Sequence, residues 1–420
     1  MNIYDFLSNI KENIELKRVR NNFLSLSSLQ ILNMFLPLVL IPYLVRVLGL
    51  ENFGLLIFAQ SFVMYFTLLI DYGFNISATR EISTHKEDYQ YISKVFFSVF
   101  FIKFCLLILS SIIFILIVLS FQLFSEHSQL YFISFAILIG QLLFPTWYYQ
   151  GIEDMKLIAI LNFFIKVFST ISIVLFTNSS NDLLLVASLN SCSYIIIGFI
   201  AFYIAFRQLS LISIDYILIK KLFYDSSSIF ISNFFSSLYS ISNNFLLGIF
   251  TNNSFVGIYS SYEKIITALK SLYIPLYQAL FPYVSRKVNK KSLIRKMIIP
   301  IAISGLVISI LIYIFANYII FLLYKNFNLI DNIYLFEIMA LIPFFSSINM
   351  LFNFLYLNSM KLYIIRMKIM ILAGVFNFII ASILLSLNYE ILSVVISYTF
   401  TELILLILGY YIFRKKYESI

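Results

Sequence analysis

Residues 95–121 read VFFSVFFIKFCLLILSSIIFILIVLSF, an apolar run in which Lys103 is the single charged side chain. A helix needs about 20 residues to cross the hydrocarbon core of a bilayer, so this run is long enough to span one. A transmembrane β-strand would instead alternate polar and apolar residues over about ten positions. The run therefore predicts a membrane-spanning helix.

Eleven further apolar runs of similar length occur along the 420 residues. The chain is 61% hydrophobic and 12% charged, and no soluble core of this size could bury so much apolar surface. We predict an all-α integral membrane protein with about twelve transmembrane helices. The predicted spans are 24–46, 53–72, 95–121, 130–149, 157–177, 183–206, 228–250, 255–283, 298–320, 333–357, 369–387 and 391–412.

Positive charge sets the predicted orientation. Of the 29 Lys and Arg residues, 23 lie at the two termini and in alternate connections, which the positive-inside rule assigns to the cytoplasm. Both termini are therefore predicted to be cytoplasmic. The net charge of +9 is explained by this orientation and by contact with anionic membrane lipids, not by nucleic-acid binding. The predicted cytoplasmic loops are 73–94, 150–156, 207–227, 284–297 and 358–368.

The chain divides into two halves of six predicted spans, which predicts two lobes around a central cavity. A weak internal sequence similarity supports the division, because Gly54 and Gly257 occupy matching places just after a short outer turn. The predicted divisions are an amphipathic cytoplasmic N-terminal segment at 1–22, an N-lobe at 23–206, a cytoplasmic linker at 207–227 and a C-lobe at 228–420.

No metal site and no cofactor is predicted. Cys105 and Cys192 are isolated in separate spans, and neither His85 nor His127 has a partner at ligand spacing. The sequence shows no nucleophile and base arranged as in an enzyme site. We therefore predict a transporter, not an enzyme.

Charged side chains within the spans indicate a functional lumen. A lysine at mid-membrane costs roughly 2.5–3.5 kcal/mol, so Lys166 and Lys270, which lie far from span ends, favour a water-filled cavity with a positive lining. Lys103, Lys264 and Arg46 lie nearer span ends and can extend toward the headgroups. A positively lined cavity would attract a phosphate-bearing anion.

Polar residues recur at helical spacing along several spans, some of them on the same faces as these cations. The alternative explanation is that Ser, Asn and Thr side chains only hold helices together through hydrogen bonds. The candidate substrate-binding residues of the lumen are Lys166, Lys270, Lys264, Arg46, Asn162, Asn233, Ser236, Ser240 and Asn243.

Four acidic residues are candidates for ion coupling or gating: Asp71, Glu263, Glu337 and Glu402. Each could carry H+ or Na+, pair with a nearby cation, or lie at the headgroup level. The sequence leaves these alternatives open.

Four motifs stand out along the chain: PYLVRVLGLENFG (42–54), LLIDYGFNISATREIS (68–83), PTWYYQGIEDMK (145–156) and LYIPLYQALFPYVSR (272–286). They resemble motifs of the O-antigen flippases, which are polysaccharide transporters of the multidrug/oligosaccharidyl-lipid/polysaccharide exporter superfamily. Length and number of spans agree with this family along the whole chain.

The resemblance implies a flippase of the bacterial inner (cytoplasmic) membrane. Its substrate would be an undecaprenyl-diphosphate-linked O-antigen or related polysaccharide repeat unit, moved from the cytoplasmic to the periplasmic leaflet by alternating access. It also implies a polysaccharide polymerase and a chain-length regulator as partners. The alternative function is a drug/cation antiporter of the same superfamily. That activity requires acidic residues deep in a lobe, whereas the deepest charges here are mostly basic.

Overall fold

A computed structural model describes residues 14–210, 212, 215–286 and 289–415, except for the side chains of residues 14–34, 240, 279, 282 and 286. Every regular element in this part of the chain is a helix, which confirms the all-α prediction. Residues 1–13 of the predicted amphipathic segment lie outside the described residues.

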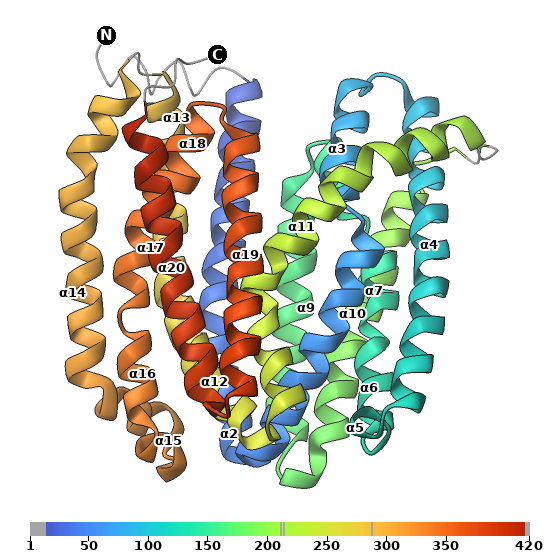
Figure 1. Ribbon diagram of the computed structural model, residues 1–420. Coiled ribbons are helices and arrows are strands. Elements are labelled where there is room, and N and C mark those ends of the chain that lie inside the picture. Colours follow the sequence, from blue (N-terminus) through green and yellow to red (C-terminus); the bar gives the residue numbers. More distant parts are fainter. Residues whose placement is uncertain (1–13, 211, 213–214, 287–288, 416–420) are drawn as a thin grey trace. The chain divides into compact units, whose positions relative to one another are not determined.

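The helices follow one another with short connections (Figure 1). The first half contains α2 (Ile14–Asp71), α3 (Phe74–Thr84), α4 (Tyr89–Ser120), α5 (Gln122–Ser125), α6 (Ser128–Phe135), α7 (Ile137–Leu143), α8 (Thr146–Gly151), α9 (Met155–Phe176), η1 (Ser180–Asp182) and α10 (Leu183–Phe206). The second half contains α11 (Tyr216–Phe250), α12 (Asn253–Ser271), α13 (Tyr273–Arg286), α14 (Lys290–Tyr324), α15 (Phe327–Asp331), α16 (Ile333–Met339), α17 (Ile342–Met350), η2 (Leu351–Tyr356), α18 (Leu357–Ser359), α19 (Tyr363–Ser386) and α20 (Glu390–Arg414).

Nine helical stretches among the described residues are long and apolar enough to cross a membrane. One of them, Phe35–Thr84, covers the two predicted spans on either side of Gly49, so the nine stretches account for ten predicted spans. The other two, 228–250 and 255–283, lie on α11 and on α12 with α13, which carry more polar residues. All twelve predicted spans therefore fall on helices, and the protein is a multi-pass helical membrane protein.

The chain forms two compact units. Of the described residues, the first unit contains 14–36, Phe66–Phe176 and Val186–Phe230. The second contains Pro37–Tyr65, Thr177–Leu185 and the residues from Ile231 onward. The lobe boundaries drawn from the sequence stay a prediction.

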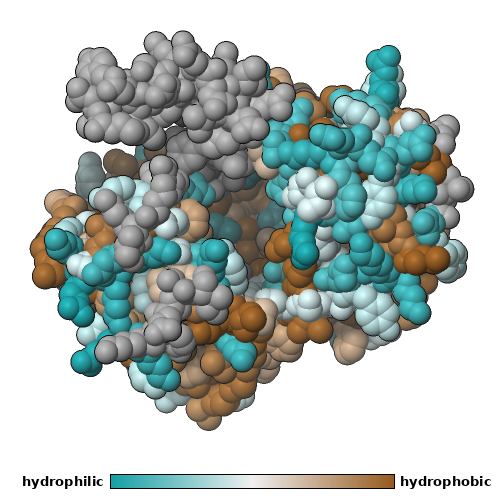
Figure 2. Space-filling view, turned by 90° about the horizontal axis from the view of Figure 1, so that it is seen from above, coloured by the Kyte–Doolittle hydropathy of each residue, from teal (hydrophilic) through white to brown (hydrophobic). Residues whose placement is uncertain are grey.

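Apolar side chains on the outer helices require a hydrocarbon environment. Only 28% of the apolar window of α4 and 22% of that of α14 is buried inside the protein. Seen end-on, hydrophilic side chains cover much of the described surface, with patches of hydrophobic ones among them and at the edges (Figure 2). Apolar flanks with polar ends are the surface that a bilayer selects.

Two sequence motifs pack against each other in the first unit. Helix α8 lies within the motif at 145–156, and helix α3 contains the second half of the motif at 68–83. The two helices pack against each other. The Thr79 hydroxyl donates to the carbonyl of Trp147 at 3.0 Å, and Gly151 lies so close to Ile82 that a larger side chain would clash. The motif residues here therefore serve the packing of two helices.

Glycine also sets the path of α2 in the second unit. Gly49 has φ 77° and ψ 167°, a conformation that other residues rarely adopt, and it bends the helix between two predicted spans. After the bend, Gly54 packs directly on α12 at Gly257. The two glycines that occupy matching places in the sequence thus meet at one helix crossing. A side chain at Gly257 would collide with the backbone carbonyl of Leu50.

We expect Gly257→Ala to destabilise the second unit by about 1–3 kcal/mol, because an added methyl group must push two helix backbones apart. The measurement is the thermal unfolding midpoint of the purified protein in detergent. Thr267→Ala, at an exposed position of the same helix, serves as the control. An unchanged midpoint for Gly257→Ala would show that the helices do not approach as closely as described.

Candidate functional site

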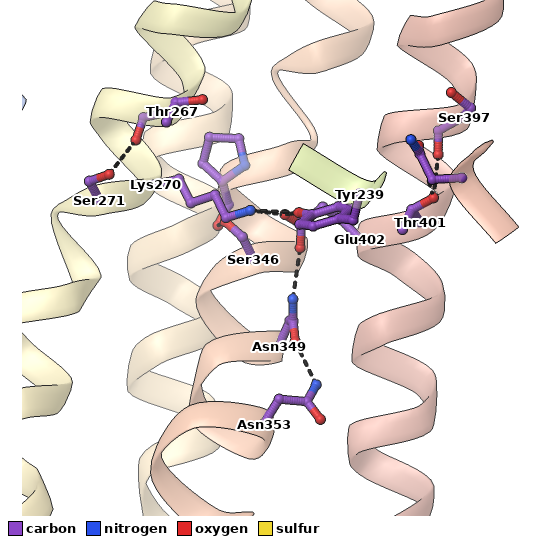
Figure 3. Close-up of polar contacts among 12 residues, drawn as sticks. Tyr239, Thr267, Lys270, Ser271, Ser346, Asn349, Asn353, Ser397, Thr401 and Glu402 are labelled. Atoms are coloured by element: carbon purple, nitrogen blue, oxygen red, sulfur yellow. Dashed lines mark hydrogen bonds and ion pairs between the residues drawn. The ribbon is translucent and has the colours of Figure 1, made fainter. Parts of the chain in front are cut away.

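A buried ion pair lies inside the second unit. The Lys270 ammonium on α12 contacts the Glu402 carboxylate on α20 (Figure 3). The Glu402 side chain is fully buried, whereas Lys270 keeps 19% of its side-chain surface exposed. Lys270 is therefore the member of the pair that a ligand can reach.

Neutral donors complete the surroundings of Glu402. The Tyr239 hydroxyl from α11 donates to one carboxylate oxygen and accepts a hydrogen bond from Lys270 Nζ at 2.6 Å. Asn349 Nδ2 from α17 donates to the other oxygen at 2.8 Å. Asn353 Nδ2 from η2 then donates to Asn349 Oδ1 at 2.6 Å (Figure 3). Three elements besides α20 thus contact the carboxylate directly, and η2 supports it through Asn349.

Two tyrosine rings flank the ammonium. Lys270 Nζ lies 5.0 Å from the centroid of the Tyr239 ring and 5.6 Å from that of Tyr398. The negative faces of aromatic rings attract a cation at this distance. The lysine is thus held in its charged form by one carboxylate and two rings.

The backbone near Asn353 departs from the regular α-helix. Residues Leu351–Tyr356 form a π-helical segment directly after α17. Such segments change the direction of side chains and are frequent at functional sites. Here the segment lets Asn353 bond both Asn349 and, at 2.9 Å, the carbonyl of Leu405 on α20.

The energetics explain why the network is so complete. A buried charge without a partner is very costly, and breaking a buried ion pair by removing one partner costs about 3–5 kcal/mol. Lys270, Tyr239 and Asn349 together occupy both oxygens of Glu402. Both carboxylate oxygens therefore have hydrogen-bond partners although the side chain has no contact with water.

A second network of neutral groups continues from this pair. Asn243 Nδ2 donates to the Tyr259 hydroxyl at 2.9 Å, and Asn377 Nδ2 from α19 donates to Asn243 Oδ1 at 2.9 Å. Thr401, the residue before Glu402, donates to Asn377 Oδ1 at 3.3 Å. Asn243, predicted as a lumen residue, is thus buried among helices and holds them together.

Glu263 belongs to a separate group on the same helix as Lys270. Asn244 Nδ2 donates to Glu263 Oε2 at 2.9 Å, and the Ser260 hydroxyl donates to Asn244 Oδ1 at 2.6 Å. Glu263 is buried and makes no ion pair with any described residue. Lys264, the next residue, is half-buried and likewise makes no ion pair within the described part.

The first unit contains an ion pair of its own. Lys103 Nζ lies 2.9 Å from Asp71 Oδ1, with 3% of the lysine and 33% of the aspartate side chain exposed. Lys103 is therefore buried and paired, and does not extend to the headgroups as the sequence suggested. The sequence left open whether Asp71 and Glu402 carry an ion, pair with a cation or lie at the headgroups. In the structure, each of them pairs with a lysine.

Lys166 and Asn162 lie on α9 of the first unit. Both side chains are half-buried. The Asn162 amide donates to the carbonyl of Ile158 in its own helix at 2.9 Å. Further along the same helix, Ser169 donates to Asn190 Oδ1 at 3.3 Å, which joins α9 to α10.

Arg46 caps the end of a helix. Its Nη2 donates to the carbonyl of Leu322 at 3.1 Å and to that of Leu323, both in the last turn of α14. Carbonyls at a helix C-terminus have no partner within the helix and carry partial negative charge. The exposed guanidinium therefore stabilises this helix end, which gives it a structural role.

The other predicted residues lie apart from these networks. Asn233 is exposed and Ser236 half-buried on α11, and the side chain of Ser240 lies outside the described residues. Glu337 on α16 is half-buried and makes no ion pair in the described part of the chain. Within the second unit, the structure thus brings Lys270 and Glu402 together.

Sequence reasoning missed Tyr239, Tyr398 and Asn377. A signal for Tyr239 was available, because it continues the polar face of Ser232 and Ser236 at helical spacing. The pairing of Lys270 with Glu402 had no signal, since 132 positions separate them in the chain.

The chemistry of the site suits an anion. The Lys270 ammonium has three donors and directs two of them at Tyr239 and Glu402. Because part of the lysine side chain is exposed, the third donor can be directed at a ligand. No group of three or more His, Cys, Asp or Glu side chains that could hold a metal ion occurs among the described residues.

Comparison with known structures supports the fold. The structure is similar to an inward-facing multidrug resistance transporter of the MATE family and MOP superfamily, with a TM-score of 0.71 at 14% identity, covering 90% of this chain and 94% of that one. An outward-facing multidrug resistance transporter of the same family and superfamily matches with a TM-score of 0.56 at 15% identity, covering 94% of each chain. At these identities the likeness shows the fold alone.

Relatives by sequence point to the family. A protein of Escherichia coli (strain K12) named "Putative O-antigen transporter" is 27% identical over 306 residues, which is 71% of this chain and 74% of the relative. A protein of the same name from Shigella dysenteriae is 28% identical over 273 residues, which is 64% of this chain and 68% of the relative. Residues 19–288 match the model of the family described as polysaccharide biosynthesis protein. Since this match covers more than half of the chain, the protein belongs to the polysaccharide biosynthesis protein family.

Proposed function

We propose that the protein is a flippase for undecaprenyl-diphosphate-linked O-antigen or related polysaccharide repeat units. It moves them from the cytoplasmic to the periplasmic leaflet by alternating access. The observation that carries this proposal is the similarity over 306 residues to a relative named as an O-antigen transporter. The transporter fold and the anion-binding chemistry of Lys270 support it.

The substrate explains why a charged site is needed within the membrane. A diphosphate loses its hydration when it leaves water, and a cation must replace that stabilisation. Lys270 presents an ammonium with 19% of its side chain exposed, inside a bundle of apolar helices. Lys264, a half-buried cation on the same helix, can add to the positive potential there. In the first unit, Lys166 on α9 is a half-buried cation and a further candidate for contact with the diphosphate.

The cellular setting follows from the same proposal. The protein lies in the bacterial inner membrane with both termini in the cytoplasm, surrounded by membrane lipids. A polysaccharide polymerase and a chain-length regulator act on the product. Direction comes from downstream polymerisation, from the membrane potential or from antiport of H+ or Na+.

The sidedness of the lipid-linked repeat units tests the function. In spheroplasts that lack the protein, we expect repeat units to accumulate and to be shielded from an impermeant glycosidase. Restoring the protein should expose them on the outer face. If the units reach the outer face at the normal rate without the protein, and no second flippase compensates, the proposal is wrong.

A pair of variants separates binding by Lys270 from its part in folding. Lys270→Met leaves Glu402 buried without its cation, which should cost about 3–5 kcal/mol if the carboxylate stays ionised. Adding Glu402→Gln removes that charge, so the double variant should recover the unfolding midpoint. We expect the double variant to flip at least about tenfold more slowly than wild type, because the anion has lost its cation.

The flipping rate in spheroplasts and the thermal midpoint of the purified protein provide the two readouts. Lys220→Met, on the distant N-terminal part of α11, is the matched control and should leave both unchanged. Full transport by the folded double variant would remove Lys270 from the substrate site without disproving the flippase.

A further inference from the structure

The Lys270–Glu402 pair is neutral as it stands, so a bound diphosphate would bring negative charge that has no counter-ion. We propose that Glu402 takes up one proton when a phosphate-bearing ligand binds to Lys270, so that the anion and the proton bind together. This inference rests on the proposed function, because it takes the ligand to be the diphosphate head of the lipid-linked substrate.

The geometry gives the two partners different access. Lys270 is partly exposed and Glu402 is fully buried behind it. An anion can therefore reach the exposed side of the ammonium without first displacing the carboxylate. Once bound, it lies on the same ammonium as Glu402, and two anions then share one cation.

Two negative groups at one buried site raise the free energy of the ionised carboxylate. A like charge nearby and removal from water both favour the neutral form of an acid. The diphosphate remains charged because part of it stays on the exposed side of Lys270. Glu402 has no exposed surface through which water could screen its charge, so it is the group that becomes neutral.

The network around Glu402 can accept the neutral acid. Asn349 Nδ2 donates to Oε2 in either state, and the Tyr239 hydroxyl now bonds to Oε1. A proton on Oε1 can be donated to the Tyr239 oxygen when the hydroxyl rotates, since a hydroxyl can both donate and accept. The step adds one proton from water to one carboxylate, and no other covalent bond changes.

Other titratable groups near Glu402 are few. Lys270 from α12 and Tyr239 from α11 contact it directly, and Tyr398 lies one helical turn away on α20, beside the Tyr239 ring and Lys270. Glu263, further along α12, is bonded to Asn244.

The neighbouring helices add no further proton carrier. From α17 and η2 the contacts are Asn349 and Asn353, which do not titrate. In the described parts of α16 and α19, no titratable side chain is bonded to Glu402. Substitutions of Glu402 alone can therefore show whether a proton taken up at this site binds to Glu402.

Infrared difference spectroscopy reads the proton directly. The full-length protein is reconstituted in liposomes, and farnesyl diphosphate serves as the probe. Calorimetry on the same samples establishes saturation. We expect saturating probe to produce the carbonyl-stretch band of a protonated carboxylic acid. In Glu402→Asp the band should shift, and in Glu402→Gln it should be absent.

Probe affinity gives a second readout. Glu402→Gln mimics the protonated acid, so it no longer opposes the anion, and we expect it to bind the probe about tenfold more tightly than wild type. Glu390→Gln, which removes an exposed carboxylate at the first residue of α20, should keep both the wild-type band and the wild-type affinity. If this control binds the probe and shows the band as wild type does, the changes seen in Glu402→Gln are specific to Glu402.

Two outcomes would overturn the inference. One is saturation of the wild-type protein with no carboxylic acid band, which requires no variant to fold. The other is a band that persists in Glu402→Gln. Neither outcome touches the proposed function, which is decided by the sidedness of repeat units in spheroplasts. If the probe does not bind at all, the site does not take a diphosphate and the inference fails as well.

Discussion

Burial of the Glu402 carboxylate is the constraint on which the second unit depends. A charge that has left water must be matched by a cation and by donors on each oxygen. Meeting that requirement ties together α11, α12, α17 and η2 around α20. The helices of this unit are thus held in register by a polar centre as well as by apolar packing.

The two buried pairs are built with opposite exposure. In the first unit the lysine is buried and Asp71 keeps 33% of its side chain exposed, so a carboxylate faces the accessible side. In the second unit the carboxylate is sealed and Lys270 is the exposed partner. An ion pair alone therefore does not define an anion site. What matters is which member of the pair is exposed, and of these two pairs only the second exposes its cation.

The apolar runs and their spacing predicted the helices because length and hydrophobicity are local properties of the chain. The glycines at 54 and 257 also left a sequence signal, and the structure shows their packing contact. The ion pairs could not be predicted in the same way. Lys103 and Asp71 are 32 positions apart, and Lys270 and Glu402 are 132 apart, so only the packing of distant helices brings them together. For the same reason Arg46, which reads as a lumen cation, caps a helix 276 positions away.

A lysine buried in this position without a counter-ion would be costly. Removing the charge of an ammonium from water costs several kcal/mol unless an anion lies beside it, on the order given by buried ion pairs. Glu402 balances the charge of Lys270 in the empty site, and the rings of Tyr239 and Tyr398 support the ammonium. When a diphosphate takes over the role of counter-ion, protonation removes the competing charge without moving a helix. One carboxylate thus serves the empty state as an ion and the loaded state as an acid, which keeps the cation ready in both.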